Sequence, residues 1–135
     1  MASITALRQG LANNLNTIPF LRAQATIPDQ ITGPVAIVEL DHVDHNKAFH
    51  AGMVEYYFNI LVVVGRVVER SAQNLMDEFA SSTGAKSISI AVQSDRTLGG
   101  AAYEVNLQSM QNYGSLSVGE VDYLSATFTV VVYAN

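Results

Sequence analysis

Residues 53–67, MVEYYFNILVVVGRV, decide how the rest of the chain folds. Apolar and polar residues alternate over the first half of this stretch, with Glu55 and Asn59 on one face. A period of two in β-branched and aromatic residues predicts a β-strand. From Leu61 onward both faces are apolar, so we expect that half to be covered on both sides and the strand to lie at the centre of a sheet. So long a strand is expected to bend or bulge, at Gly65.

The length of 135 residues predicts one domain, residues 1–135, with a core of its own. The chain contains no cysteine, which excludes disulfides and thiolate metal sites. No stretch reaches the roughly 18 uninterrupted apolar residues of a membrane span. The opening residues, MASITALRQG, lack the basic and then apolar pattern of a signal peptide. We therefore expect a soluble protein that has no membrane partner and stays in the compartment where it is made.

The charge content is low. Charged residues make up 14% of the chain and hydrophobic residues 49%, against about 25% charged residues in an ordinary domain. One interpretation is a neutral surface rich in Ser, Thr, Asn and Gln. The other is a surface that faces further copies or partners, since the centres of interfaces are poor in charge. The net charge of −5 argues against nucleic-acid binding through clustered Lys and Arg. After Arg96 the charged residues are Glu104, Glu120 and Asp122, so that part of the surface is neutral to acidic.

A helix is predicted over residues 3–17, and we expect it to pack on the sheet. Apolar residues recur there at helical spacing, Ser3 is a candidate N-cap, and Pro19 ends the element. The apolar stripe consists of Ile4, Leu7, Leu11, Leu15 and Ile18. The asparagines that fall mostly off this stripe are Asn13, Asn14 and Asn16.

Two strands and two loops are predicted between this helix and the central strand. Residues 21–26 alternate as in a short, half-exposed strand, and residues 27–34 form a loop punctuated by glycine and proline. Residues 35–40, VAIVEL, form a second strand. Residues 41–52, DHVDHNKAFHAG, are polar and contain all three histidines, which predicts an exposed loop.

A second helix follows the central strand, with Ser71 as a candidate cap and Gly84 as a stop. Its predicted buried face consists of Leu75, Met76, Phe79 and Ala80. Residues 87–92, SISIAV, are ambiguous. Their apolar residues alternate as in a strand but also fit one face of a helix, and propensity alone favours the strand.

The last third of the chain predicts a turn at residues 98–100, a strand at 103–108, a turn or loop at 112–119 and a final strand at 121–133. No internal repeat is present. The order helix, three strands, helix, an ambiguous element and two strands predicts an α+β fold. We expect a largely antiparallel or mixed sheet of about four to five strands, with two to three helices packed on it.

The histidine-rich stretch is the one candidate site that the residue types suggest. His42, His45 and His50, with Asp41 and Asp44, offer imidazole and carboxylate ligands. Their spacing, His-x2-His-x4-His, matches no helical face and no metal motif. We therefore predict a solvated loop, no metal site and no cofactor.

Motifs of catalysis are absent from the sequence. The chain has no Gly-x-Ser-x-Gly elbow and no serine with an evident base. Gly99 and Gly100 lack the residues of a phosphate-binding loop or a dinucleotide site, which favours a plain turn. The carboxylates of Asp77 and Glu78 point apart on the predicted helix. We therefore predict that the protein is not an enzyme.

Aromatic residues outside the core pattern are candidates for subunit contacts. Tyr56 and Tyr57 lie on opposite faces of the central strand, so at least one is expected to be buried. Phe20, Phe49 and Tyr113 lie beside predicted loops, where local packing is the alternative role. The interface candidates are Phe20, Phe49, Tyr57 and Tyr113.

Four segments carry a resemblance to a known family, and together they cover nearly the whole chain in order. They are residues 4–38 (ITALRQGLANNLNTIPFLRAQATIPDQITGPVAIV), 56–81 (YYFNILVVVGRVVERSAQNLMDEFAS), 83–105 (TGAKSISIAVQSDRTLGGAAYEV) and 113–135 (YGSLSVGEVDYLSATFTVVVYAN). Each alone is a packing or turn pattern. In their order, spacing and total length, the chain resembles the tail terminator proteins of long-tailed bacteriophages, especially those common in phages of actinobacteria.

The resemblance implies a structural role without chemistry. Tail terminators form a ring, here expected to be a hexamer, that caps the tail tube, stops the addition of tube subunits and presents the face that joins the head connector. The implied partners are further copies of the chain, the tail tube protein and the head-tail connector or stopper protein. DNA passes through the lumen without specific binding. The implied location is the neck of the virion, and the host cytoplasm during assembly.

The resemblance also bears on two segments of the chain. It favours a short helix at residues 87–94, against the strand propensity of SISIAV. Residues 41–52 lie where members of the family vary, so the resemblance assigns no role to His42, His45 or His50.

Two other functions stay open. The chain could be another neck component, such as a head-tail connector or tail completion protein, and the partner, tail tube or portal complex, separates these roles. A small metal-dependent enzyme or binding module that uses the three histidines is the remaining alternative, which a zinc or nickel titration tests.

Overall fold

The computed structural model describes residues 3–18, 21–24, 34–45, 54–66, 70–118 and 120–134. Three helices and five strands follow one another as α1 (Ile4–Leu15), β1 (Arg22–Gln24), β2 (Val35–Asp44), β3 (Val54–Arg66), α2 (Arg70–Ala80), α3 (Ile88–Val92), β4 (Glu104–Val118) and β5 (Val121–Ala134). These elements form an α+β fold, which confirms the predicted fold class.

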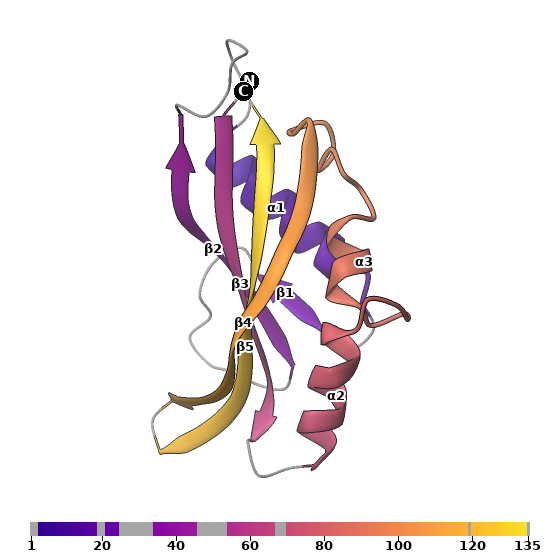
Figure 1. Ribbon diagram of the computed structural model, residues 1–135, viewed down its shortest axis with the longest axis vertical. Helices are drawn as coiled ribbons and strands as arrows, with labels where there is room; N and C mark the ends of the chain where they lie inside the picture. The colour runs from indigo at the N-terminus through magenta and orange to yellow at the C-terminus, as the bar shows by residue number, and fades with distance from the viewer. Residues whose placement is uncertain are drawn as a thin grey trace.

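β3 lies at the centre of a five-stranded sheet with the order β1-β2-β3-β5-β4 (Figure 1). β1 pairs with β2 in parallel, and all other neighbours are antiparallel. The prediction that residues 53–67 supply the central strand is therefore confirmed. The predicted bulge is confirmed too, because the register between β3 and β5 shifts between Val63 and Gly65.

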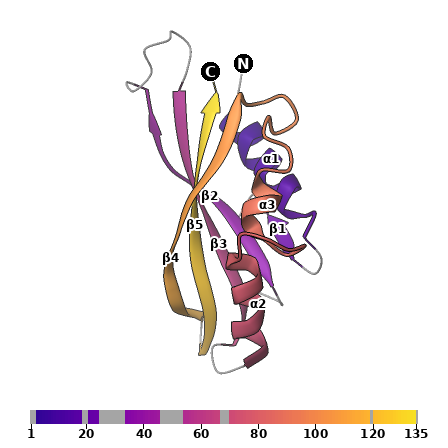
Figure 2. The same cartoon turned by 45° about the vertical axis from the view of Figure 1, so that its right-hand side comes forward.

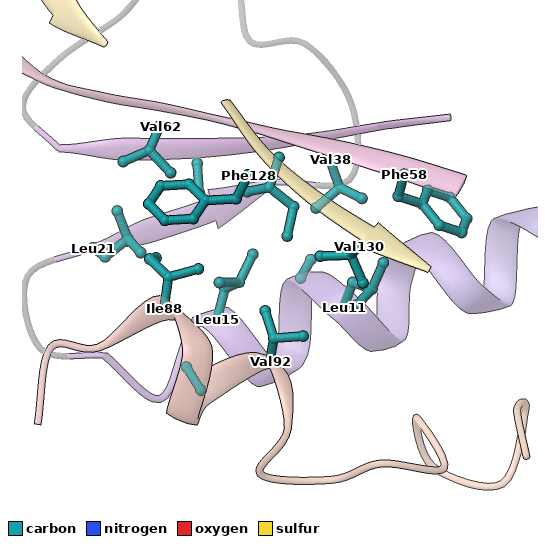
Figure 3. Close-up of a cluster of buried hydrophobic side chains, with 14 of the residues drawn as sticks. Leu11, Leu15, Leu21, Val38, Phe58, Val62, Ile88, Val92, Phe128 and Val130 are labelled. Atoms are coloured by element: carbon teal, nitrogen blue, oxygen red, sulfur yellow. The ribbon is translucent and has the colours of Figure 1, made fainter. Parts of the chain in front are cut away.

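All three helices cover one face of the sheet (Figure 2). The even-numbered side chains of β3 point to this face, where Phe58, Ile60 and Val62 are fully buried. Each pairs with buried neighbours on β2 or β5, and the helices close the layer from the other side (Figure 3). The predicted stripe of α1 is confirmed by the full burial of Leu7, Leu11 and Leu15.

The opposite face of the sheet, which no described helix covers, carries a small apolar cluster of its own. Val35, Ile37 and Val63 are buried there, with the half-buried Leu61, Leu116 and Tyr123 packed against them. Because Val62 and Val64 are buried on the helix face, β3 is covered on both sides beyond Leu61. The apolar residues 61–64, LVVV, predicted that both faces of the strand are covered here.

Residues 88–92 form the helix α3, so the strand that propensity favours is wrong and the helix that the resemblance favours is confirmed. The Ser87 hydroxyl caps the helix by accepting a hydrogen bond from the Ile90 amide at 3.3 Å. Ile88 and Val92 are fully buried on one helical face. Local capping and burial against α1 outweigh the intrinsic preference of isoleucine and valine for strands.

Two predicted loops are wrong in the described part of the chain. Residues 41–44 continue β2, because residues 42–44 pair with β3 after the bulge at Asp41 despite the polar side chains. Residues 112–118 continue β4, so the strand predicted at 103–108 runs on to Val118. Asn112 takes a positive φ of 57° inside a bulge, which accommodates the turn-like sequence NYG without ending the strand.

The predicted boundaries of α2 also need correction. The helix begins at Arg70, so Ser71 lies in its first turn and is not the N-cap. Met76 and Phe79 are fully buried as predicted, whereas Ala80, the last residue of the helix, is exposed. Of the strand predicted at residues 21–26, β1 contains Arg22–Gln24, and residues 25–26 lie outside the described part.

Candidate functional site: a polar cleft on the helix-free face

The helix-free face of the sheet holds a cleft of about 390 Å³. Its floor comes from β3 and β5, and its walls come from β2 and β4. The lining residues are Asp41, His42, Tyr57, Asn59, Gln108, Gln111, Asn112, Thr127 and Thr129. None of these nine is lysine or arginine, and one is a carboxylate. The lining therefore suits a neutral or basic polar partner better than a phosphate.

Three β-bulges build the walls of this cleft. In β2 the register shifts between Leu40 and His42, which leaves Asp41 as the extra residue. In β4 the register shifts twice, around Gln108 and around Asn112. A bulge redirects a side chain out of the regular alternation of a strand, and bulges are frequent beside functional sites. Here each bulge contributes one polar side chain to the lining.

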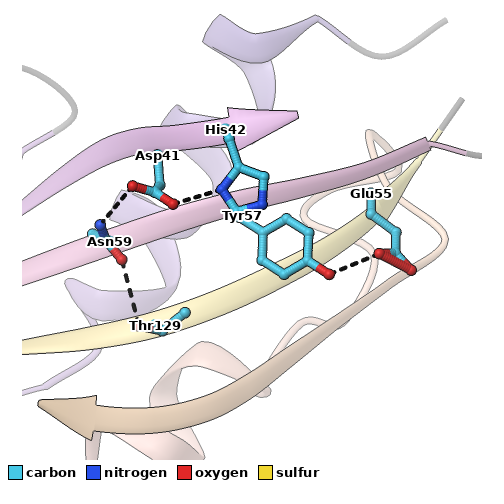
Figure 4. A network of polar contacts seen from close by, with 6 residues as sticks. All are labelled: Asp41, His42, Glu55, Tyr57, Asn59 and Thr129. Carbon is cyan, nitrogen blue, oxygen red and sulfur yellow. Dashed lines mark hydrogen bonds and ion pairs between the residues drawn. The ribbon is translucent and has the colours of Figure 1, made fainter. Parts of the chain in front are cut away.

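A chain of hydrogen bonds runs across three strands of the cleft (Figure 4). The Thr129 hydroxyl donates to Asn59 Oδ1 at 3.4 Å, and Asn59 Nδ2 donates to Asp41 Oδ1 at 3.3 Å. The other carboxylate oxygen of Asp41 lies 2.6 Å from His42 Nδ1. Because a carboxylate only accepts, this contact places a proton on Nδ1 and leaves Nε2 of the exposed imidazole facing solvent or a partner.

Tyr57 connects the cleft to the acidic end of the sheet. Its ring stacks on the His42 imidazole with the centroids 4.3 Å apart and the planes at 11°. Its hydroxyl donates to Glu55 Oε2 at 2.7 Å. This hydrogen bond, together with burial and the nearby negative charge, raises the pKa of Tyr57 from its ordinary value to about 12.

Alkaline titration is expected to reveal the hydrogen bond between Tyr57 and Glu55. The raised pKa of Tyr57 means that its contribution to stability is present below pH 10, the ordinary tyrosine range, and is lost as the pH rises through about 12. Subtracting the tyrosinate absorbance of Tyr57→Phe from that of the wild type isolates one of the six tyrosines. In Glu55→Gln, which removes the negative acceptor, the pKa of Tyr57 should move down. A wild-type difference curve centred on the ordinary value and unchanged in Glu55→Gln would contradict the observed contact.

Three carboxylates lie in one row across the sheet, next to the cleft. Asp44 pairs with Glu55, Glu55 with Tyr133, and Tyr133 with Glu104. Glu104 is also bound by Arg96, whose Nη1 lies 2.7 Å from Oε1 in an exposed ion pair. Glu39 and Asp41, which lie opposite the middle of β3, add two further carboxylates to the helix-free face.

The predicted interface residues and the histidines lie in different places. Tyr57 lines the cleft, and Tyr113 follows the bulged Asn112 on β4 with 44% of its surface exposed. Phe20, Phe49 and His50 lie outside the described residues. His42 belongs to β2 and to the cleft, and His45 is exposed just after the strand. The described residues contain no group of three or more histidines and carboxylates placed to hold a metal ion.

Sequence reasoning missed the amides of the cleft. Gln108 ends a predicted strand, Asn112 begins a predicted loop, and Gln111 lies between the two. Turn-type residues between two alternating runs can signal a bulge as well as a loop. That pattern was the only local signal available.

The described residues thus form an α+β fold with a helix layer on one side of the sheet and a polar cleft on the other. Neither protein-family models nor curated proteins give a match to the chain. Among the described helices, the longest has 12 residues, and none is long and apolar enough to cross a membrane.

Proposed function

We propose that the protein is a tail terminator, a structural subunit of a ring in the neck of a long-tailed bacteriophage. In this role six copies cap the tail tube, stop its polymerisation and present the face that joins the head connector. The partners are the tail tube protein and the connector or stopper protein, and DNA passes through the lumen. The ring belongs to the virion, and its subunits assemble in the host cytoplasm.

The observation that carries this proposal is the helix α3. The residue types of SISIAV favour a strand, whereas the resemblance to tail terminators favours a short helix at the same place. The structure has a capped helix there, with Ile88 and Val92 buried against the rest of the core. The resemblance therefore predicted a feature that propensity alone did not, which supports using it as a guide to function.

The surface of the described residues is consistent with this role. Its two broad faces differ, since helices cover one side of the sheet and the other side carries the polar cleft and a small apolar cluster. A ring needs two different patches on each subunit, because each copy contacts its neighbours head to tail. An acidic subunit also suits a channel for DNA, since negative charge repels phosphate and does not hold it in place.

The test is assembly in solution and on tubes. Light scattering over a concentration series gives the mass of the purified protein, and electron microscopy shows the shape of any large species. We expect rings of about six copies, formed in solution or on the tips of purified tail tubes, and tubes that no longer grow when the protein is added. A protein that stays monomeric and leaves tube growth unchanged would refute the proposal.

The same experiment separates the neighbouring roles. Binding to purified portal complexes without binding to tubes would make the protein a connector or completion protein. Tight binding of zinc or nickel, lost when His42 and His45 are replaced by alanine, would favour the metal-dependent alternative. Because Asp41 engages Nδ1 of His42, Nε2 is the nitrogen that such a metal would use.

A further inference from the structure

We propose that, in the assembled ring, the outer face of α1 of one copy docks on the acidic cleft face of the next copy. This inference rests on the proposed ring function and names the two surfaces that meet. The cleft face consists of Glu39, Asp44, Glu55, Glu104 and the nine residues that line the cleft. The outer face of α1 consists of the exposed Thr5, Ala6, Gln9 and Asn13, with Arg8 beside them.

The cleft face selects its partner by charge. Glu39 and Asp41 are exposed there, and the half-buried Glu55 lies in the adjoining row, whereas the charge of Glu104 in that row is offset by its ion pair with Arg96. Two such faces would repel each other, so a symmetric contact between the cleft faces of two copies is disfavoured. The partner surface must instead be free of carboxylates and rich in hydrogen-bonding groups.

α1 meets this requirement in sequence and in structure. Its twelve residues, ITALRQGLANNL, contain no aspartate or glutamate, and Arg8 is their single charged residue. Arg8 makes no ion pair with a described residue, and its Nε is shielded from solvent without a hydrogen-bond partner. By contrast, the larger exposed surface of α2 carries Asp77 and Glu78.

The hydrogen-bonding groups of the two surfaces match. Gln108 and Asn112 present amides that no described residue engages, and Thr127 adds a hydroxyl. On α1, Gln9 Nε2 donates to Asn13 Oδ1 at 3.0 Å, which leaves the oxygen of one amide and the NH₂ group of the other for a partner. Amide groups pair with one another as donor and acceptor at once.

The positions of the two surfaces suit a head-to-tail contact between copies. α1 lies on the helix side of the sheet and the cleft on the other side, so the surfaces point in opposite directions (Figure 2). A contact between different patches on opposite sides is heterologous, and copies joined in this way form a ring where the rotation from one copy to the next closes, and an open filament where it does not. A contact through α1 also explains why the helix has few charged residues, since the centre of an interface is depleted in charge.

The test uses two charge variants and their mixture. The helix variant Gln9→Glu/Asn13→Glu makes α1 acidic, and the face variant Glu39→Lys/Asp41→Lys makes the cleft face basic. The control Gln73→Glu/Asn74→Glu adds the same two charges to the exposed side of α2. Circular dichroism and urea unfolding establish that each variant is folded, and light scattering or tube capping reports assembly as for the wild type.

We expect each of the two variants alone to need at least a tenfold higher concentration for assembly, whereas the control assembles like the wild type. An equimolar mixture of the helix and face variants should assemble again, because acidic helices meet basic faces at alternate contacts around an even-numbered ring. Assembly of the helix variant at the wild-type concentration would overturn this inference and leave the proposed function intact, as would a mixture that fails to recover. Failure of the wild type to form rings or cap tubes would overturn both.

Discussion

Replacing Asn14 with leucine is expected to lower the free energy of unfolding by about 1–3 kcal/mol, because it removes two hydrogen bonds and leaves the buried Val92 carbonyl without this donor, while the Asp95 carbonyl still accepts from the Leu98 amide. Asn14 lies in α1 with 6% of its surface exposed. Its Nδ2 donates to the carbonyl oxygens of Val92 and Asp95, each at 3.0 Å. Leucine has the same number and branching of side-chain heavy atoms, so the change removes the hydrogen bonds without leaving a cavity.

The two carbonyls explain why this side chain matters. Val92 ends α3 and Asp95 begins the turn that leads to β4, so Asn14 ties α1 to a connection that is 78 residues or more away in sequence. The turn is ordered further by Asp95, whose carboxylate accepts hydrogen bonds from Thr97 Oγ1 and from the amides of Thr97 and Gly99. The Thr97 and Gly99 contacts lower the pKa of Asp95.

Urea unfolding measures this effect, with Asn13→Leu as the matched control. Asn13 is the next residue of α1 but points to solvent, where its side chain accepts a hydrogen bond from Gln9. Its replacement should change the free energy of unfolding by no more than about 0.5 kcal/mol. Equal midpoints for Asn14→Leu and Asn13→Leu, with equal slopes, would show that the buried hydrogen bonds do not stabilise the fold.

The role of Asn14 marks the limit of the sequence reasoning. Helical periodicity predicted α1 correctly. The apolar stripe at residues 7, 11 and 15 is a local pattern, and burying it stabilises the helix on the sheet. The same pattern placed Asn14 mostly off the stripe, although the residue is buried. A polar side chain at the border of a stripe is buried only if a distant segment supplies its partners, and no local signal reports that.

The close packing of α1 against the turn at residues 98–100 could not be predicted from the sequence either. A Cβ at Gly10 would lie 2.7 Å from the Cβ of Leu98 and 3.2 Å from its carbonyl oxygen. Glycine is a poor helix former, so its presence in the middle of α1 is explained by this close approach of the turn before β4. Leu98 itself takes a positive φ of 50°. The turn at residues 98–100 was predictable from its two glycines, but its docking site on α1 was not.

The cleft depends on the register of four strands, which explains why it could not be predicted. Asp41, Tyr57, Gln111 and Thr129 come from four separate strands, and three of the wall residues point inward only because bulges redirect them. The histidines drew attention to residues 41–52 on residue type alone. His42 does belong to the cleft, but as a stacking partner of Tyr57 within a strand and not as part of a loop.

Phe58→Ala is expected to be the most destabilising of the substitutions considered, with a loss of about 3–5 kcal/mol. Phe58 is fully buried at the centre of β3, and its register neighbours are Leu40 on β2 and Val130 on β5. Figure 3 shows its ring between the sheet and α1, beside Val130. Truncation removes the apolar area of the ring and opens a cavity that a sheet on one side and a helix on the other cannot readily collapse to fill.

The size of this loss can be checked by thermal and urea unfolding. For a chain of this length it corresponds to a fall in the unfolding temperature of roughly 10–20 °C. Phe58→Leu keeps most of the apolar volume and should lose clearly less, whereas Tyr103→Ala, at a position 56% exposed, should change stability by about 0.5 kcal/mol or less. A small effect of Phe58→Ala would mean that α1 and β3 do not share one core. A large effect would show that the core between β3 and α1 contributes strongly to the stability of the fold.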